Sequence, residues 1–297
     1  MTAPRQHVYT SQRLRLSYWA WGDEANPPLV LVHGMRDHAR AWDRVAEAFE
    51  RDYYVVALDL RGHGDSQWST GAHYGWTEFM LDLVALIDEV GGRASVVGHS
   101  VGGGIALFAA GVFPERFAHL VSIEGVNPWL HGDRPPGPER MREWAERAQE
   151  ERPPRVYAGF DAALARLREV NPRLDPPLAE HLTREGTRPA GDGEPAGGLV
   201  WKYDPWLLTQ HGLDVRTEEF PRYWAAIECP VLHIVGDTSP LRRATFAGRP
   251  LDEHFADART LRVADAGHWV HHDRLEETVT AVRLFLATDG GEAARGR

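Results

Sequence analysis

The stretch Val96-Val97-Gly98-His99-Ser100-Val101-Gly102-Gly103 decides the fold, because a short apolar run ends at a serine with a glycine two residues away on either side. A sharp turn from a strand into a helix strains the backbone of its apex residue, and small residues at these two positions prevent clashes. Residues 94–97 are typical of a strand, and residues 101–113 are compatible with a helix. We therefore interpret the stretch as a nucleophile elbow that presents the Ser100 hydroxyl above a sheet.

Composition limits the classes of protein to which the chain can belong. Its 297 residues suffice for two small domains or for one large α/β domain with an insertion, and 43% of them are hydrophobic. The net charge of −10 argues against a nucleic-acid partner, which requires a clustered basic face. No apolar run reaches the length of a membrane span, and no secretion signal is evident, so we expect a cytoplasmic protein without a membrane partner.

The cysteine and histidine content argues against a metal or another cofactor. Cys229 is the single cysteine, which excludes an internal disulfide, and its place before Pro230 at the start of an apolar run predicts a packed side chain. The 15 histidines show neither an H-E-x-x-H motif nor a cysteine-rich spacing. We predict no metal site and no cofactor, and the oligomeric state stays open.

Strand-like runs alternate with helical patterns over most of the chain. The clearest helix is predicted over residues 77–90, with its apolar residues on one face and with Asp82 and Asp88 off that face. Continuous apolar strands between helices predict a mostly parallel α/β sheet that helices cover on both sides. The strand-like runs are residues 13–18, 29–32, 53–58, 95–97, 120–123, 231–235 and 260–263.

The alternation of strands and helices breaks between Pro128 and Pro221. This segment contains a proline-rich turn at 133–138, helical patterns around 141–151 and 161–170, and a link rich in glycine and proline at 189–198. We interpret it as an inserted helical lid. The predicted organisation is a core domain over residues 1–128, a lid or cap over residues 129–220, and a completion of the core over residues 221–297.

A serine nucleophile requires a base within hydrogen-bond reach, an acid that orients the base, and donors aimed at the developing oxyanion. The candidate base is His268, because it follows the last predicted strand and precedes the closing amphipathic helix at 275–286. The strand at 29–32 ends in a glycine turn, so the amides of Met35 and Val101 are the candidate oxyanion-hole donors.

Four motifs in this order resemble the α/β-hydrolase superfamily. They are His33-Gly34, Asp59-Leu60-Arg61-Gly62-His63-Gly64, Gly98-His99-Ser100-Val101-Gly102-Gly103 and Gly267-His268-Trp269. The resemblance implies an eight-stranded sheet with a lid inserted after the sixth strand, which is where the alternation breaks. Lid segments such as Asn171-Pro172-Arg173-Leu174 are further similar to the serine hydrolase-like proteins. We expect the loop at 59–66 to brace its neighbours, and a fold of this kind does not fix the substrate.

The orienting acid has two candidates. In many members of the superfamily the acid lies three residues beyond a glycine after the seventh strand, but Gly236-Asp237-Thr238-Ser239 places a serine there. Asp237 comes two residues too early. The predicted sixth strand ends in Glu124, and a charge at the end of an apolar run needs a partner. One subgroup of haloalkane dehalogenases and the serine hydrolase-like proteins are similar in this respect, so we prefer Glu124 and keep Asp237 as the alternative acid.

These residues predict a serine esterase that works through an acyl-enzyme intermediate. Ser100 attacks an acyl carbonyl, His268 removes and later returns the proton, and Glu124 holds the imidazole. Thioesters and lactones are further candidate substrates. Two alternatives stay open: an enzyme with the same triad that cleaves carbon–carbon bonds or uses peroxide, and a non-catalytic receptor for a small ligand. Dehalogenation is disfavoured because dehalogenases of this superfamily carry aspartate at the elbow.

The expected partner is a small-molecule substrate with an apolar or aromatic part, because the lid and the neighbouring loops are rich in aromatic residues. The candidate pocket residues are Trp42, His99, Trp129 and Trp269. The lid itself offers Trp129, Trp144, Tyr157, Trp201, Tyr203 and Trp206. Arg36, Asp37 and His38 follow the oxyanion turn. Contact with the substrate is one interpretation of these residues, and a solvated loop is the one that we prefer.

Overall fold

The computed structural model describes residues 3–125, 137–150, 152–191, 194, 197–208, 215–240, 245–246 and 249–288. Eight strands form one sheet in the order β1-β2-β4-β3-β5-β6-β9-β12. They are β1 (Arg5–Ser11), β2 (Leu14–Trp21), β3 (Pro28–Val32), β4 (Tyr54–Leu58), β5 (Ala94–His99), β6 (Phe117–Ile123), β9 (Val231–Gly236) and β12 (Ala258–Val263). Strand β2 is antiparallel to both of its neighbours, and all other pairings are parallel. The predicted eight-stranded, mostly parallel sheet is confirmed.

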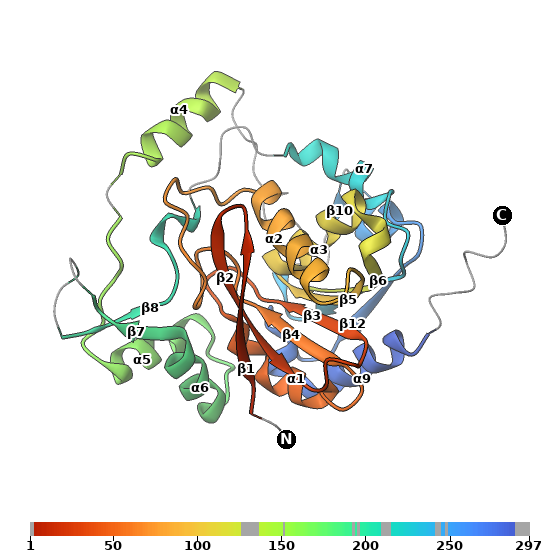
Figure 1. The fold of residues 1–297 in the computed structure, drawn as a ribbon, viewed down its shortest axis with the longest axis horizontal. Helices are drawn as coiled ribbons and strands as arrows, with labels where there is room; N and C mark the ends of the chain where they lie inside the picture. Colours follow the sequence, from red (N-terminus) through yellow and green to blue (C-terminus); the bar gives the residue numbers. More distant parts are fainter. Residues whose placement is uncertain are drawn as a thin grey trace.

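Helices cover both faces of the sheet (Figure 1). One face packs against α2 (Trp76–Glu89), α3 (Val101–Val112) and α7 (Phe220–Trp224). The other face packs against α1 (Asp43–Phe49), α8 (Val270–Asp273) and α9 (Leu275–Leu286). The alternation of side chains along a strand separates the two cores. In β3, Val30 and Val32 face the first core, whereas Leu29 and Leu31 face the second.

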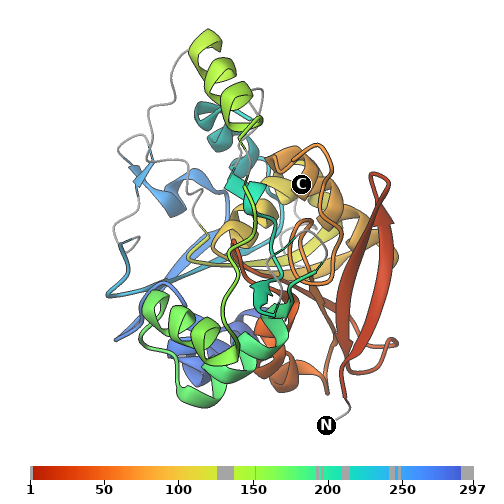
Figure 2. The ribbon, with the colours of Figure 1, turned by 90° about the vertical axis from the view of Figure 1, so that its left-hand side faces the viewer.

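The chain between β6 and α7 adds no strand to the main sheet in its described part. It contains α4 (Gly137–Arg147), α5 (Phe160–Val170), α6 (Pro176–Gly186) and a small hairpin of β7 (Thr187–Pro189) and β8 (Leu199–Trp201). Helix α4 buries none of its side chains, and Figure 2 shows it apart from α5 and α6. Trp129 and the proline-rich turn up to residue 136 lie outside the described residues. The lid boundaries at 129 and 220 stay a prediction.

Short elements complete the described chain. A two-residue pairing joins β10 (Thr245–Phe246) to β11 (Arg249–Pro250). The short 3-10 helices are Ala39–Trp42, Pro114–Arg116, Pro205–Leu208, Thr217–Glu219 and Leu251–His254. Helix α6 begins with two prolines after Asp175, whose carboxylate accepts a hydrogen bond from the amide of Leu178 at 2.9 Å. Proline suits the first turn of a helix because the amide that it lacks has no acceptor there.

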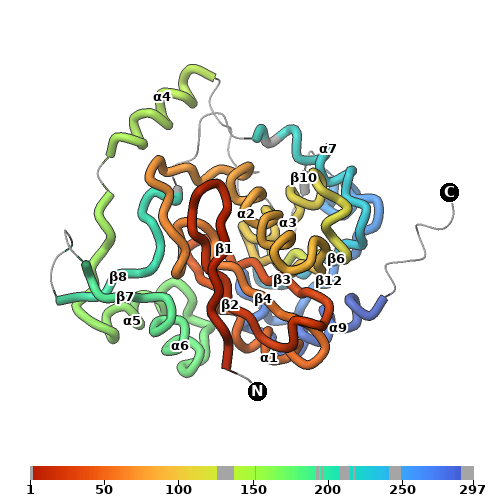
Figure 3. Tube along the Cα trace, in the orientation of Figure 1, coloured from red at the N-terminus to blue at the C-terminus, as the bar shows by residue number. Residues whose placement is uncertain are grey.

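Asp82 lies on the buried side of α2, contrary to the expectation from helical periodicity. The Arg61 guanidinium donates hydrogen bonds to both of its carboxylate oxygens, at 2.6 and 2.7 Å, and neither side chain is more than 2% exposed. The Tyr9 hydroxyl donates to the Asp82 carbonyl at 3.0 Å. The ion pair therefore ties the loop after β4 to α2, and the Tyr9 hydrogen bond ties α2 to β1. Figure 3 traces the hairpin of β1 and β2 beside α2. Helical periodicity predicted an exposed Asp82, because the spacing of apolar residues within one helix carries no information about an arginine elsewhere in the chain.

Asp82→Asn is expected to destabilise the protein by about 3–5 kcal/mol, because the variant leaves the charge of Arg61 buried without a counter-ion. Urea denaturation measures this change in the free energy of unfolding. Asp88→Asn on the same helix is the matched control, because Asp88 forms its ion pair with Arg116 at the surface. We expect a change below about 1 kcal/mol for it, and equal effects of the two substitutions would contradict the prediction.

Candidate active site

Ser100 occupies the turn between β5 and α3 with backbone angles φ 52° and ψ −121°. This left-handed φ is strained for a residue with a side chain, and such strain is typical of functional sites. The surrounding backbone is packed very closely. A Cβ atom on Gly98 would lie 2.5 Å from the Gly102 carbonyl oxygen, and one on Gly102 would lie 2.4 Å from the Val32 carbonyl oxygen. The predicted strand-turn-helix is therefore present, and its two glycines allow this close approach.

The structure brings His268 to Ser100. His268 Nε2 lies 3.0 Å from Ser100 Oγ, and His268 Nδ1 lies 3.3 Å from a carboxylate oxygen of Glu124. Because an ionised carboxylate only accepts hydrogen bonds, Nδ1 carries the proton and Nε2 is free to accept the Ser100 hydroxyl. The imidazole is 29% exposed, whereas the Glu124 side chain is fully buried. The three groups form one chain of hydrogen bonds that leads from the interior to the surface.

Of the two acid candidates, the structure brings Glu124 and not Asp237 to the imidazole. Glu124 follows β6 directly, and its second carboxylate oxygen accepts the amide of Gly236 at 2.8 Å. Asp237 is exposed at the end of β9. Ser239, which occupies the position of the more common acid, donates its hydroxyl to Glu124 at 2.5 Å. The sequence analysis did not predict that Ser239 would donate a hydrogen bond to the acid. The available signal was that Ser239 occupies the more common acid position, next to the strand that ends in Glu124.

The two candidate oxyanion donors lie on either side of the elbow. The Val101 amide is the first of α3, and the first amides of a helix have no acceptor within it. Met35 follows the turn after β3, and the next amide, that of Arg36, donates to His63 Nε2 at 3.0 Å. His63 donates in turn from Nδ1 to the Arg61 carbonyl at 3.0 Å. His63 is therefore neutral, and burial lowers its pKa to about 4.

The loop at 59–66 holds the oxyanion turn in place, as expected from its glycines and charges. His33 Nε2 accepts the amide of Leu60 at 3.1 Å. The buried carboxylate of Asp59 accepts the amides of Ala39 at 2.7 Å and Asp65 at 3.0 Å. These hydrogen bonds join the loop after β4 to the segment after β3, so the position of the Met35 amide depends on both.

The predicted pocket residues have different positions. His99 is 1% exposed and donates from Nε2 to the His268 carbonyl at 2.9 Å, so it holds the base from behind and does not line a pocket. Trp42 is fully buried and stacks on His271 in the core, because residues 39–42 turn inward as a 3-10 helix. These two predictions were wrong. Trp269 does line a cavity.

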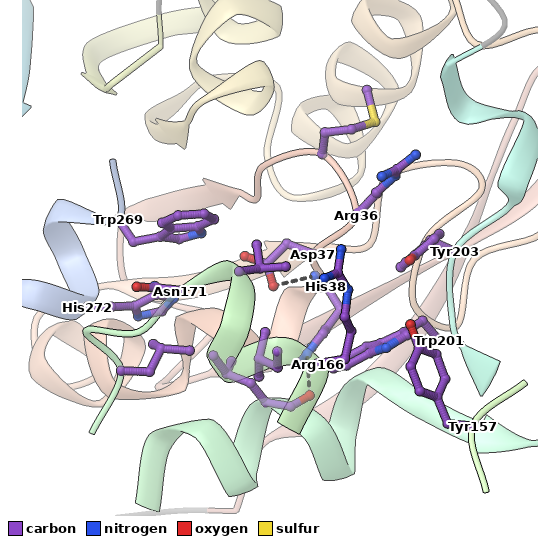
Figure 4. Close-up of a pocket in the computed structure, with 15 residues that line it drawn as sticks. Arg36, Asp37, His38, Tyr157, Arg166, Asn171, Trp201, Tyr203, Trp269 and His272 are labelled. Carbon is purple, nitrogen blue, oxygen red and sulfur yellow. Dashed lines mark hydrogen bonds between the residues drawn. The ribbon is translucent and has the colours of Figure 1, made fainter. Parts of the chain in front are cut away.

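A cavity of about 200 Å³ has in its wall Met35, a candidate oxyanion donor, and Trp269, the residue after His268. Figure 4 shows Trp269 at one side of this cavity. Residues 36–38 line it as well. His38 is buried and donates from Nε2 to the Leu182 carbonyl of α6 at 3.1 Å, so the expectation of a solvated loop was wrong for this residue, whereas Arg36 is exposed as expected. Burial raises the pKa of Asp37 to about 7. The lining residues are Met35, Arg36, Asp37, His38, Tyr157, Arg166, Leu167, Val170, Asn171, Leu174, Leu182, Trp201, Tyr203, Trp269 and His272.

Two further findings concern the described residues only. None of their histidine, cysteine, aspartate and glutamate side chains form a group of three or more that could hold a metal ion. Among the helices in this part of the chain, none combines the length and the apolar character that crossing a membrane requires.

The family model for the alpha/beta hydrolase fold matches residues 27–275. The chain therefore belongs to the α/β-hydrolase family. This match agrees with the order of the sheet, the elbow and the insertion after β6, and it places the chain among hydrolases of the α/β fold.

Individual proteins are similar to the chain over most of its length. Esterase YbfF of Escherichia coli (strain K12) is 26% identical over 268 residues, which cover 88% of this chain and 93% of that protein. Human serine hydrolase-like protein 2 is 29% identical over 211 residues, 67% of this chain and 64% of that protein. The solved structure of a thioesterase domain from the curacin biosynthetic pathway has a TM-score of 0.82 and 22% identity, and the match covers 95% of this chain and all of that one. The expected likeness to serine hydrolase-like proteins is confirmed.

Seven histidines of the described chain are wholly or partly buried, and burial favours their neutral form. Burial lowers the pKa of His63 and His233 to about 4, that of His38 and His272 to about 3, and those of His33, His99 and His271 well below the ordinary value. In the unfolded chain these side chains have a pKa of about 6.5. The unfolded state therefore binds more protons than the folded state below this pH. Groups with a raised pKa act in the opposite direction but are fewer. Burial raises the pKa of Asp37 and Asp59 to about 7 and also raises that of Asp82 and Asp204, and the hydrogen bond to Asp43 raises the pKa of His181.

The free energy of unfolding is expected to fall as the pH is lowered from about 6.5 to about 4, by about 1.4 kcal/mol per pH unit for each excess proton. Urea titrations at a series of pH values measure this slope. His233→Leu removes one of these histidines, and leucine is an apolar replacement at a position that packs against Phe255. Because one fewer group takes up a proton on unfolding, the free energy of unfolding of this variant is expected to depend less steeply on pH. A stability that does not change over this pH range, or an equal slope in the variant, would contradict the prediction.

Proposed function

We propose that the chain is a serine hydrolase that cleaves carboxylic esters through an acyl-enzyme intermediate, with thioesters and lactones as further candidate substrates. The supporting observation is the continuous set of hydrogen bonds from Ser100 through His268 to Glu124 beside a cavity. A serine hydroxyl is a weak nucleophile until a base accepts its proton, and this geometry supplies the base and its support.

In the proposed mechanism, Ser100 Oγ attacks the acyl carbonyl carbon while His268 Nε2 takes the hydroxyl proton. Glu124 stabilises the positive charge of the imidazolium. The amides of Met35 and Val101 donate hydrogen bonds to the tetrahedral oxyanion. His268 then returns the proton to the leaving alcohol. Water, deprotonated by the same imidazole, attacks the acyl-enzyme, and collapse of the second tetrahedral intermediate releases the acid and restores Ser100.

The similar proteins support acyl transfer, because one is named an esterase and the fold neighbour is a thioesterase domain. Aromatic rings of Tyr157, Trp201 and Trp269 in the cavity support a small-molecule substrate with an apolar or aromatic part. We further propose a cytoplasmic enzyme that needs no metal or cofactor, with the lid over residues 129–220 as the part that sets specificity. The acidic net charge of −10 supports the absence of a nucleic-acid partner.

A fluorophosphonate probe is expected to label the parent protein and not Ser100→Ala, because the probe reacts with an activated serine. Turnover of aryl esters with acyl chains of increasing length then defines the preferred substrate. Absence of labelling would favour a non-catalytic ligand receptor. Labelling without turnover of any ester would favour cleavage of carbon–carbon bonds or use of peroxide by the same triad.

Glu124→Gln is expected to lower kcat by on the order of 10⁴-fold, because the amide NH₂ faces His268 Nδ1 and favours the wrong tautomer. Asp237→Asn removes an equal charge at an exposed position, and we expect nearly parental kcat. Steady-state kinetics on one aryl ester compares the two variants, and thermal melting verifies that both fold. If Asp237→Asn is the inactive variant, the acid has been assigned wrongly.

A further inference from the structure

One side of the cavity contains arginine side chains in an otherwise acidic protein. Arg36 and Arg166 both line the cavity, and Figure 4 shows them with Tyr203 on the side opposite Trp269. The Arg36 guanidinium lies 5.6 Å from the centre of the Tyr203 ring, and Arg36 makes no ion pair with any of the residues that the structure describes. Arg166 has an exposed partner, Glu169, at 2.9 Å. Because the whole chain has a net charge of −10, the two arginines Arg36 and Arg166 form a positive cluster that is local to the cavity.

A third guanidinium, that of Arg155, lies near Arg36, Arg166 and Tyr203. Arg155 stacks on Tyr157, a buried residue of the cavity wall, at 5.0 Å from the ring centre. Burial raises the pKa of the Tyr203 hydroxyl, and the charges of Arg36, Arg166 and Arg155 act against that rise. The three positive charges are therefore close enough to one phenol ring to favour a negative charge beside it.

Apolar side chains form another part of the wall, together with the polar side chains of His38, Asn171 and His272. Leu167, Leu174 and Leu182 come from the lid, whereas Met35 supplies a candidate oxyanion amide and Trp269 follows His268 in the chain. We therefore expect a ligand whose carbonyl meets the Ser100 hydroxyl to extend past Met35 and Trp269 toward the guanidinium groups. Its chemistry is then a reactive carbonyl, an apolar chain and an anionic end.

We propose that Arg36 and Arg166 bind a carboxylate of the substrate, so that the enzyme prefers esters that carry a carboxylate on an apolar chain. The inference rests on the proposed ester hydrolysis. Guanidinium groups bind carboxylates through charged hydrogen bonds in a fixed geometry. A doubly charged phosphate is less suitable, because the carboxyl of Asp37 lines the same cavity and repels a second negative charge more strongly.

The first experiment compares kcat/KM for pairs of esters. Monomethyl esters of glutarate, adipate, pimelate and suberate are compared with methyl esters of the monocarboxylic acids of equal length. Acetyl esters of 4-hydroxybutyrate and 6-hydroxyhexanoate, compared with butyl and hexyl acetate, test a carboxylate on the alcohol side. We expect about a tenfold preference for the anionic member of at least one pair, and a smaller preference at high salt. Equal kcat/KM within every pair would overturn the proposal.

The second experiment combines Arg36→Gln with Arg166→Gln. The double variant is expected to lose the preference for anionic esters, so that the ratio of kcat/KM between the anionic and the neutral member of each pair falls to about 1. Arg168→Gln is the matched control, because Arg168 is an exposed arginine on the same helix that is not part of the cavity wall. A preference that persists in the double variant, or is lost equally in the control, would overturn the proposal.

Binding to Ser100→Ala separates this inference from the proposed function. Calorimetry measures the affinity of this variant for monomethyl adipate and methyl hexanoate, with and without the two arginine substitutions. If no ester is hydrolysed but monomethyl adipate binds about tenfold more tightly when the arginines are present, the carboxylate site stands and ester hydrolysis fails. If the arginines do not change the affinity, the carboxylate site is overturned whether or not esters are cleaved.

Discussion

The parallel pairing of β5 with β3 and of β6 with β5 and β9 is the constraint on which the site depends. The carboxyl ends of parallel strands meet at one edge of a sheet, so the residues after these strands lie together. Two hydrogen bonds extend the pairing beyond the strands: Ser100 donates its amide to Ile123, and Glu124 donates its amide to Ile234, both at 2.9 Å. The positions of the proposed nucleophile and acid are therefore fixed by the same backbone hydrogen bonds that hold the sheet.

The elbow could be predicted from sequence because it depends on local sterics. Glycines on both sides of a serine, between an apolar run and a helical pattern, leave few other conformations. The preference for Glu124 as the acid could also be predicted from the sequence, because a charged residue at the end of an apolar strand requires a partner. Strand β1 was not predicted from its own residues, because it lies at the edge of the sheet and most of its side chains are exposed.

The predictions that failed concern contacts between segments far apart in the chain. Asp82 and Arg61 pair across 21 positions, and helical periodicity contains no information about such a partner. His99 belongs to the elbow motif, yet packing places it against the back of His268, and Trp42 stacks on His271 in the core. The loop at 36–38 lines a cavity together with residues of α5, α6 and β8. Because several distant segments form the wall of a cavity, the motifs identified the proposed catalytic residues better than the residues of the cavity.

The hydrogen bond from Ser239 to Glu124 has a consequence for how this family can diversify. Glu124 and Ser239 follow the neighbouring strands β6 and β9, and the Ser239 hydroxyl lies within hydrogen-bond distance of the carboxylate that meets His268. A chain that held a carboxylate at both positions at once would force two like charges together, and only one of them would ionise at neutral pH. A single substitution at either position therefore produces a chain with two coupled carboxylates or with none, and only a double substitution moves the acid from one strand to the other.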